Sequence, residues 1–63
     1  MKLADAIKLV DRRIKVTNYH GTTIFEGFSA FAERNLEWYL DGLVDGIDAE
    51  IVDGNAVVVI RMA

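Results

Sequence analysis

Two common ways of stabilising a small fold are missing from this sequence, because it has no cysteine and only one histidine. Without cysteine there is neither a disulfide nor a thiolate zinc site, and one histidine is too few for a transition-metal site made of protein ligands. We therefore expect no metal and no cofactor. The 63 residues form one domain, residues 1–63, which buries only about 60% of its unfolded surface. Because 52% of the residues are hydrophobic, we expect self-association to cover part of them.

Net positive charge and long apolar runs are missing as well. Seven basic and ten acidic residues give a net charge of −3, which disfavours a general binder of phosphate backbones. The longest apolar run, residues 56–60, is far too short to span a bilayer. The first ten residues lack a signal-peptide cleavage pattern. We expect a cytoplasmic protein without a membrane partner, and nucleic acid is not the expected partner.

The first ten residues predict a short amphipathic helix, since Leu3, Ala6, Ile7 and Val10 recur at helical spacing. Two turns of helix are not stable alone, so this helix must lie on another element.

The next stretch predicts a β-hairpin, because two runs of strand-forming residues flank the turn at His20-Gly21. With Tyr19 opposite Thr22, apolar residues face one side of the hairpin and an opposite-charge pair faces the other, which makes the register self-consistent. The expected partners are Val16 and Phe25, Ile14 and Gly27, and Lys15 and Glu26.

The C-terminal stretch predicts a second hairpin, with Asp53-Gly54 as a strong two-residue turn signal. Pairing Val52 with Asn55 collects the aliphatic residues on one face, and a slip by one residue would bury charged side chains. We expect this face to be core. Its residues are Ile47, Ala49, Ile51, Ala56, Val58, Ile60 and Met62.

Between the hairpins, residues 30–40 contain neither proline nor glycine, which favours a helix. Ser29 is the expected N-cap, and Gly42 is the expected left-handed residue after the C-terminus. Apolar residues also alternate over residues 36–40, so a strand is the competing interpretation of that segment.

Five of the six aromatic residues lie within residues 24–40. The apolar arc of the expected helix spans roughly 200°, which is wider than one buried face needs. Two interpretations of Phe31 and Trp38 stay open: they belong to the core, or they form an exposed docking surface. The residues expected in the core in either case are Phe25, Phe28, Leu36, Tyr39 and Leu40.

Side chains with catalytic potential are isolated in the sequence. His20 lies in a predicted turn, and a general base needs an orienting partner and a nearby nucleophile. Ser29 is better explained as a helix cap, because no Gly-x-Ser-x-Gly pattern surrounds it. The acidic residues of segment 41–53 lack calcium-loop spacing. We therefore predict no enzyme and no catalytic, cofactor-binding or metal-binding residue.

The chain begins with a short Asp-containing helix and a hairpin that ends in Phe-Glu-Gly, and it finishes with an acidic strand and an aliphatic strand. The residues that carry this pattern are Leu3, Asp5, Ile7, Leu9, Asp11, Lys15, Val16, Gly21, Phe25, Glu26 and Gly27. It resembles small uncharacterised proteins of bacteriophages, prophages and mobile elements of Gram-positive bacteria. The aromatic segment 28–43 departs from the shorter, leucine-rich spacer of those proteins. The resemblance implies a phage or prophage context and no established activity.

Two segments, GFSAFAERNL (27–36) and VDGNAVVVI (52–60), are similar to the two motifs of Sm-like RNA-binding proteins. Ser29 stands where those proteins have an acidic residue, Asp53 stands where they have an RNA-holding arginine, and the first motif is two residues longer. This resemblance implies an alternative fold, a small Sm/SH3-like β-barrel with an N-terminal helix, and an alternative function as an RNA binder. The implied nucleic-acid positions are Asn35, Gly54 and Asn55.

The predicted fold is α+β, in the order helix, hairpin, helix, hairpin (αββαββ). Both helices are expected on one face of a four-stranded antiparallel sheet. The predicted function is a non-catalytic protein–protein interaction module of a phage or prophage-like element, which binds an unknown protein and forms a homodimer. The expected partner-binding residues are Phe31, Trp38 and Asn35.

Overall fold

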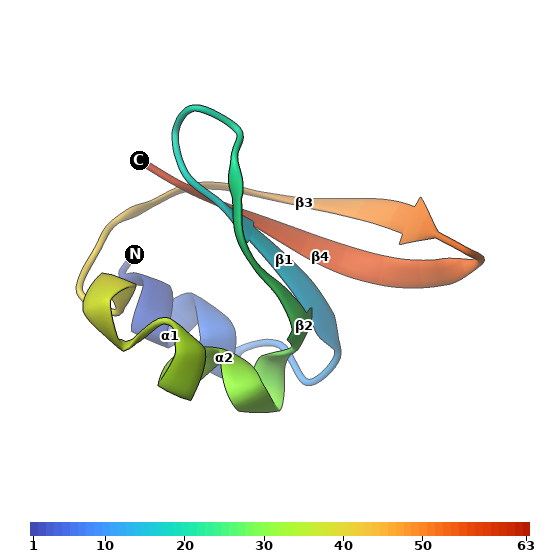
Figure 1. Cartoon of the computed structure of the whole chain (residues 1–63), viewed down its shortest axis with the longest axis horizontal. Helices are drawn as coiled ribbons and strands as arrows, with labels where there is room; N and C mark the ends of the chain where they lie inside the picture. Colours follow the sequence, from blue (N-terminus) through green and yellow to red (C-terminus); the bar gives the residue numbers. More distant parts are fainter.

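The computed structural model describes the whole chain, residues 1–63, and has the predicted αββαββ order of an α+β protein (Figure 1). The elements are α1 (Leu3–Lys8), β1 (Arg13–Thr17), β2 (Thr23–Phe28), α2 (Ser29–Asn35), the 3₁₀ helix η1 (Glu37–Tyr39), β3 (Val44–Val52) and β4 (Asn55–Met62). None of the helices is long and apolar enough to cross a membrane.

The sheet is mixed, so the prediction of a purely antiparallel sheet is wrong. Its strand order is β2-β1-β4-β3, with β1 and β4 parallel and the other two pairs antiparallel. The α2–η1 segment returns the chain to the side of the N-terminus, so β3 starts there and β4 comes back in the direction of β1 (Figure 1). The strands do not close into a barrel, and residues 36–40 contain no strand. The small-barrel alternative is therefore wrong as well.

The register of the first hairpin is confirmed, with Lys15 opposite Glu26 and Val16 opposite Phe25. The turn is wider than predicted, because the register shifts after Val16 and the last pair joins Thr17 to Thr23. The cause is the Asn18 side chain. Its Oδ1 accepts hydrogen bonds from the backbone N–H groups of His20 and Thr22, at 3.0 and 2.9 Å, and so closes a longer loop.

The register of the second hairpin is also confirmed, from Val52 opposite Asn55 to Ile47 opposite Ile60. Its turn residues Asp53 and Gly54 both have positive φ, 51° and 80°, as a type I′ turn requires. The predicted apolar face is buried only on β4, at Ile60 and Met62, and its residues on the edge strand β3 are all exposed. The tip of the hairpin extends beyond the helices (Figure 1).

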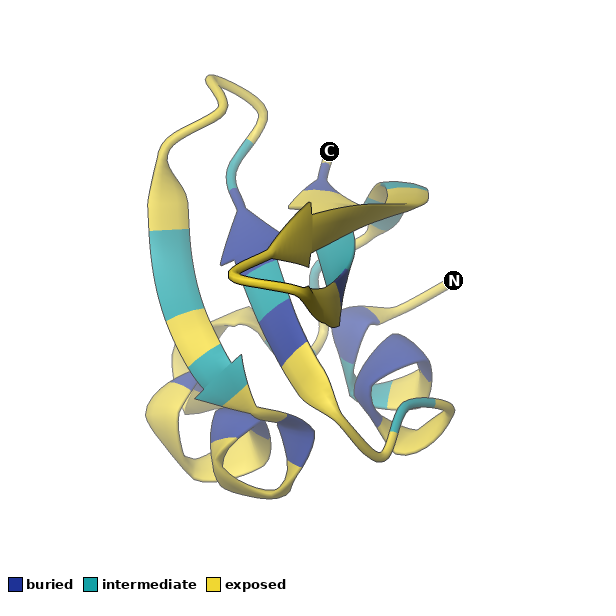
Figure 2. Ribbon diagram, turned by 90° about the vertical axis from the view of Figure 1, so that its right-hand side faces the viewer, coloured by how far each residue is buried: buried dark blue, intermediate teal, exposed yellow.

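The core lies between the central strands and the two helices, which are on the same side of the sheet, as predicted (Figures 1 and 2). Aliphatic side chains fill it, and no aromatic ring is fully buried. Its members are Leu3, Ala6, Ile7, Ile14, Val16, Ala32, Leu36, Ile60 and Met62.

The second helix is shorter than predicted, because α2 ends at Asn35 and Leu36 leaves the helical backbone at φ −116°. Ser29 is not the N-cap but the first helical residue; Phe28 occupies the N-cap position without a side-chain cap. The competing strand interpretation of residues 36–40 is wrong too, since they form a 3₁₀ turn with its flanking residues.

Because α2 ends early, backbone carbonyl groups after it accept hydrogen bonds from the N-terminus of α1, which has no side-chain cap of its own. The backbone N–H of Leu3 donates to the Gly42 oxygen at 2.9 Å, and that of Ala4 donates to the Leu40 oxygen at 3.1 Å. Gly42 does not have the predicted left-handed conformation, which belongs to Gly21 and Gly54 among the glycines. A Cβ on Gly42 would instead lie 3.1 Å from the Tyr39 oxygen and 2.6 Å from the Met62 methyl group.

Replacing Leu36 by alanine tests this description of the core. The side chain is 1% exposed, and such a truncation costs about 2–5 kcal/mol, a large part of the stability of any small domain. We expect Leu36→Ala to be largely unfolded or to melt far below the wild type in urea and thermal denaturation. The control is Leu9→Ala, whose side chain is 72% exposed and whose loss should change stability by no more than about 0.5 kcal/mol. Equal effects of the two substitutions would contradict the assigned core.

Candidate interaction surfaces

We refer to the exposed residues Phe31, Asn35 and Trp38, on α2 and η1, as the aromatic surface. The orientation of α2 follows from Ala32 and Leu36, which are 0% and 1% exposed and point into the core. Phe31 and Trp38 are consequently left 63% and 89% exposed. Their exposure excludes the interpretation that they belong to the core, and the docking surface stays a prediction.

Only some of the large apolar residues of segment 24–40 belong to the core. Leu36 is buried, and Phe25 and Leu40 pack partly buried against the core, as predicted. Phe28 and Tyr39 were expected there too, but they are 52% and 45% exposed. Aliphatic side chains, among them those of α1, β1 and β4, already fill the core between the helices and the sheet. The larger aromatic rings therefore lie at the edge of the core.

Charged residues of both signs neighbour the aromatic surface in the sequence. The Asn35 side chain donates from Nδ2 to the Phe31 carbonyl oxygen at 2.8 Å and so fixes the last turn of α2. Glu33, Arg34 and Glu37 are exposed nearby in the sequence, and none of them forms an ion pair. A surface with both signs of charge can be complementary to itself.

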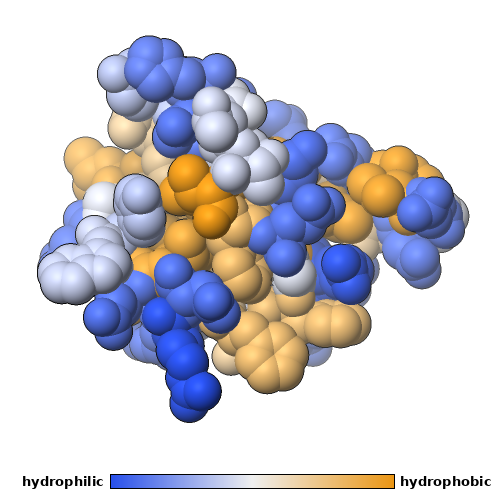
Figure 3. All heavy atoms as spheres, in the orientation of Figure 1, coloured by the Kyte–Doolittle hydropathy of each residue, from blue (hydrophilic) through white to orange (hydrophobic).

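A second exposed apolar area lies along the edge strand β3. Ile47 and Ile51 are 50% and 72% exposed, although the sequence assigns them to a buried face. Figure 3 shows apolar atoms at the far end of this hairpin with polar atoms around them, and Figure 2 shows exposure along most of β3. Sequence periodicity reveals which side these residues share, but not how far the helices reach over it.

Arginine side chains and a phenyl ring line an open depression where β1 begins. It encloses about 430 Å³ between Arg12, Arg13, Phe28, Asn55 and Ala56. The Arg13 guanidinium carbon lies 5.3 Å from the centroid of the Phe28 ring, a cation–π distance. Neither arginine forms an ion pair, so their charge is available to a single anionic group. The sequence places these five residues in three separate segments and did not reveal this site.

The residues of the RNA-binding alternative do not converge. Asn35 ends α2, whereas Gly54 and Asn55 form the tip of the β3–β4 hairpin, and the two regions lie apart in both views (Figures 1 and 2). The Asn55 side chain is used within the turn, where Nδ2 lies 3.4 Å from the Asp53 oxygen. These three positions therefore form no common binding surface.

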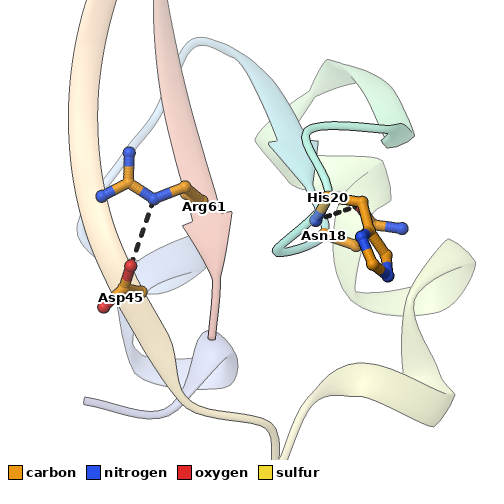
Figure 4. A network of polar contacts seen from close by, with 4 residues as sticks. All are labelled: Asn18, His20, Asp45 and Arg61. Carbon is orange, nitrogen blue, oxygen red and sulfur yellow. Dashed lines mark hydrogen bonds and ion pairs between the residues drawn. The ribbon is translucent and has the colours of Figure 1, made fainter.

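His20 lies in the exposed β1–β2 loop, where its ring is 3.9 Å from that of Tyr19 between centroids. Its backbone N–H donates to Asn18 Oδ1 (Figure 4), and no carboxylate forms an ion pair with its ring. Figure 4 also shows the ion pair between Arg61 Nε and Asp45 Oδ2, 3.2 Å apart, which ties β4 to the start of β3.

Comparison with known proteins gives no relative, since no protein-family model, no curated protein and no solved structure matches this chain. The resemblance to small phage and prophage proteins therefore remains an expectation from the sequence, and the candidate surfaces are assigned from geometry alone.

Intrinsic fluorescence tests the exposure of the aromatic surface, because Trp38 is the only tryptophan. With 89% of the side chain exposed, we expect the dilute protein to emit near the wavelength of N-acetyltryptophanamide, which serves as the control. Iodide should quench the two almost equally. A blue-shifted, quencher-resistant emission from a sample of monomeric mass would contradict the placement of Trp38.

Proposed function

We propose that this chain is a non-catalytic protein–protein interaction module that forms a symmetric homodimer through its aromatic surface. The observation that carries the proposal is the exposure of Trp38 and Phe31, at 89% and 63%. Tryptophan is among the residues that contribute most to binding hot spots. Burying the two side chains against another copy removes apolar area from water, worth about 25 cal/mol per Å².

A second copy suits this surface because its charges have both signs. In a two-fold interface the same patch meets itself, so a contact of residue i with residue j of the second copy is repeated as a contact of j with i. Arg34 of one copy can then approach Glu33 or Glu37 of the second without a like-charge conflict. The resemblance to phage and prophage proteins supplies the expected setting, in which the dimer binds an unknown host or phage protein.

An RNA-binding module is less well supported than this interaction module. It required a strand over residues 36–40 and a closed barrel, and the chain has neither. Its three implied positions also lie on separate elements. The depression at Arg12 and Arg13 is compatible with one anionic group, which falls short of a track for a nucleic-acid backbone.

Sedimentation equilibrium tests the homodimer. We expect the wild type to reach twice the monomer mass as its concentration rises, with a blue shift of the Trp38 emission over the same range. Trp38→Glu and Phe31→Glu should each remain monomeric, because each places a charge in the apolar centre of the interface. The control is Leu9→Glu, at a side chain that is also largely exposed, 72%, and that lies outside the aromatic surface.

A wild type that stays monomeric at millimolar concentration would refute the homodimer. Dimerisation that survives Trp38→Glu and is lost in Leu9→Glu would place the interface on α1 and would refute the assigned surface.

A further inference from the structure

We propose that the outer edge of β3 binds an extended segment of another protein in which apolar residues alternate with lysine or arginine. The segment would add a fifth strand to the sheet, a common mode of peptide recognition. This site uses backbone groups and side chains on β3, on a different element from the aromatic surface, and does not depend on dimerisation.

The edge is open over most of its length. β3 has β4 on one side only. On the other side the N-terminus covers only its start, where Lys2 bridges to Leu43 and the Val44 N–H donates to the Met1 oxygen at 2.8 Å. No strand lies beside residues 45–52 on that side. A long uncovered edge of this kind is a template for pairing.

The hairpin register identifies the backbone groups that point outward. Val52 and Asn55 flank a two-residue turn, so their backbone groups face each other. Because the direction alternates along an antiparallel strand, those of Glu50 and Asp48 also face β4. The N–H and C=O groups of Ile47, Ala49 and Ile51 therefore point to the open edge.

Side chains on the two faces of β3 differ, and this difference defines the ligand. Ile47 and Ile51 lie on the face toward the helices and are left 50% and 72% exposed on the edge strand. Asp48 and Glu50 lie on the opposite face. An added strand also alternates between these faces, so its apolar side chains would cover the isoleucines while its other side chains lie beside the acidic pair.

Charge decides between a second copy of this chain and a basic partner. Residues 44–62 contain four acidic residues and one arginine, a net charge of −3, which equals that of the whole chain. Antiparallel self-pairing centred on Ala49 would set Asp48 opposite Glu50 of the second copy, and like charges in that position are destabilising.

Basic residues in the added strand relieve this repulsion. Glu50 is held by Lys15 at 3.6 Å and Asp45 by Arg61 at 3.2 Å, whereas Asp48 has no basic partner. A lysine or arginine beside Asp48 would complete the set of ion pairs on that face. The occupant is therefore a segment of a different, basic protein.

Titration with short synthetic peptides tests the charge preference, followed by NMR of the backbone amides. The probe alternates lysine with valine or isoleucine, and the matched peptide carries glutamate in place of lysine. We expect the lysine peptide to shift the amides of Ile47, Ala49 and Ile51 and to bind at least about tenfold more tightly than the glutamate peptide. Asp48→Lys should reverse this order. The control variant Asp11→Lys changes the net charge equally at an exposed residue between α1 and β1 and should preserve it.

Removing outward hydrogen bonds tests strand pairing itself. Ala49→Pro deletes one outward N–H at an edge position that tolerates proline, and we expect it to abolish binding while the amide spectrum stays dispersed. Should the variant unfold, a lysine peptide N-methylated at its central residues removes the hydrogen-bond donors from the peptide instead. We expect this peptide not to bind.

Equal binding of the two peptides would overturn the proposal, as would binding that survives both backbone changes, or no amide shifts at millimolar peptide. Self-association that persists in Trp38→Glu and disappears in Ala49→Pro would also overturn it, by showing that a second copy occupies the edge.

Discussion

The parallel pairing of β1 with β4 joins two hairpins that would otherwise be separate and marginally stable units. It places Ile14 beside Val58 and Val16 beside Ile60, so the side chains of the two central strands form one continuous apolar surface. Both helices contribute side chains to the core that covers these strands. If this pairing were lost, α1 would lose the strand side chains it packs on, and a helix of six residues does not persist alone.

The lengths of the elements explain why so much apolar surface is left uncovered. Six residues of α1 and seven of α2 extend about 9 and 10 Å at a rise of about 1.5 Å per residue. The nine residues of β3 extend about 30 Å. Helices this short cannot reach the end of the hairpin. Exposure of Ile51, near the tip, is thus a consequence of pairing long strands with short helices. Ile47 lies opposite the buried Ile60 and is exposed because β3 is the edge strand.

Local chemistry made both hairpins predictable from the sequence, whereas the contacts between distant segments were not. The Asp53-Gly54 turn and the alternation of side chains determine the β3–β4 register within a few residues, and the structure has that register. Parallel β1–β4 pairing leaves no comparable signal, because nothing near either strand specifies its neighbour. The early end of α2 also depends on distant residues, since the carbonyl groups of Gly42 and Leu40 accept hydrogen bonds from the N–H groups of Leu3 and Ala4. Exposure of Phe31 and Trp38 was one of two open interpretations, because a helical pattern gives the width of an apolar arc but not the area available to bury it.

The distribution of charge separates the two exposed surfaces. Outside residues 44–62 the acidic and basic residues balance at six each, and the hairpin carries the whole net charge of −3. An uncharged edge with exposed isoleucines would pair with copies of itself and lead to aggregation. Acidic side chains along β3 oppose that outcome, and the same repulsion disappears when the added strand is basic. Beside the aromatic surface, Arg34 offers a second copy a charge opposite to that of its Glu33 and Glu37. Because the two surfaces lie on different elements, a dimer formed through α2 and η1 would still leave two acidic edges free.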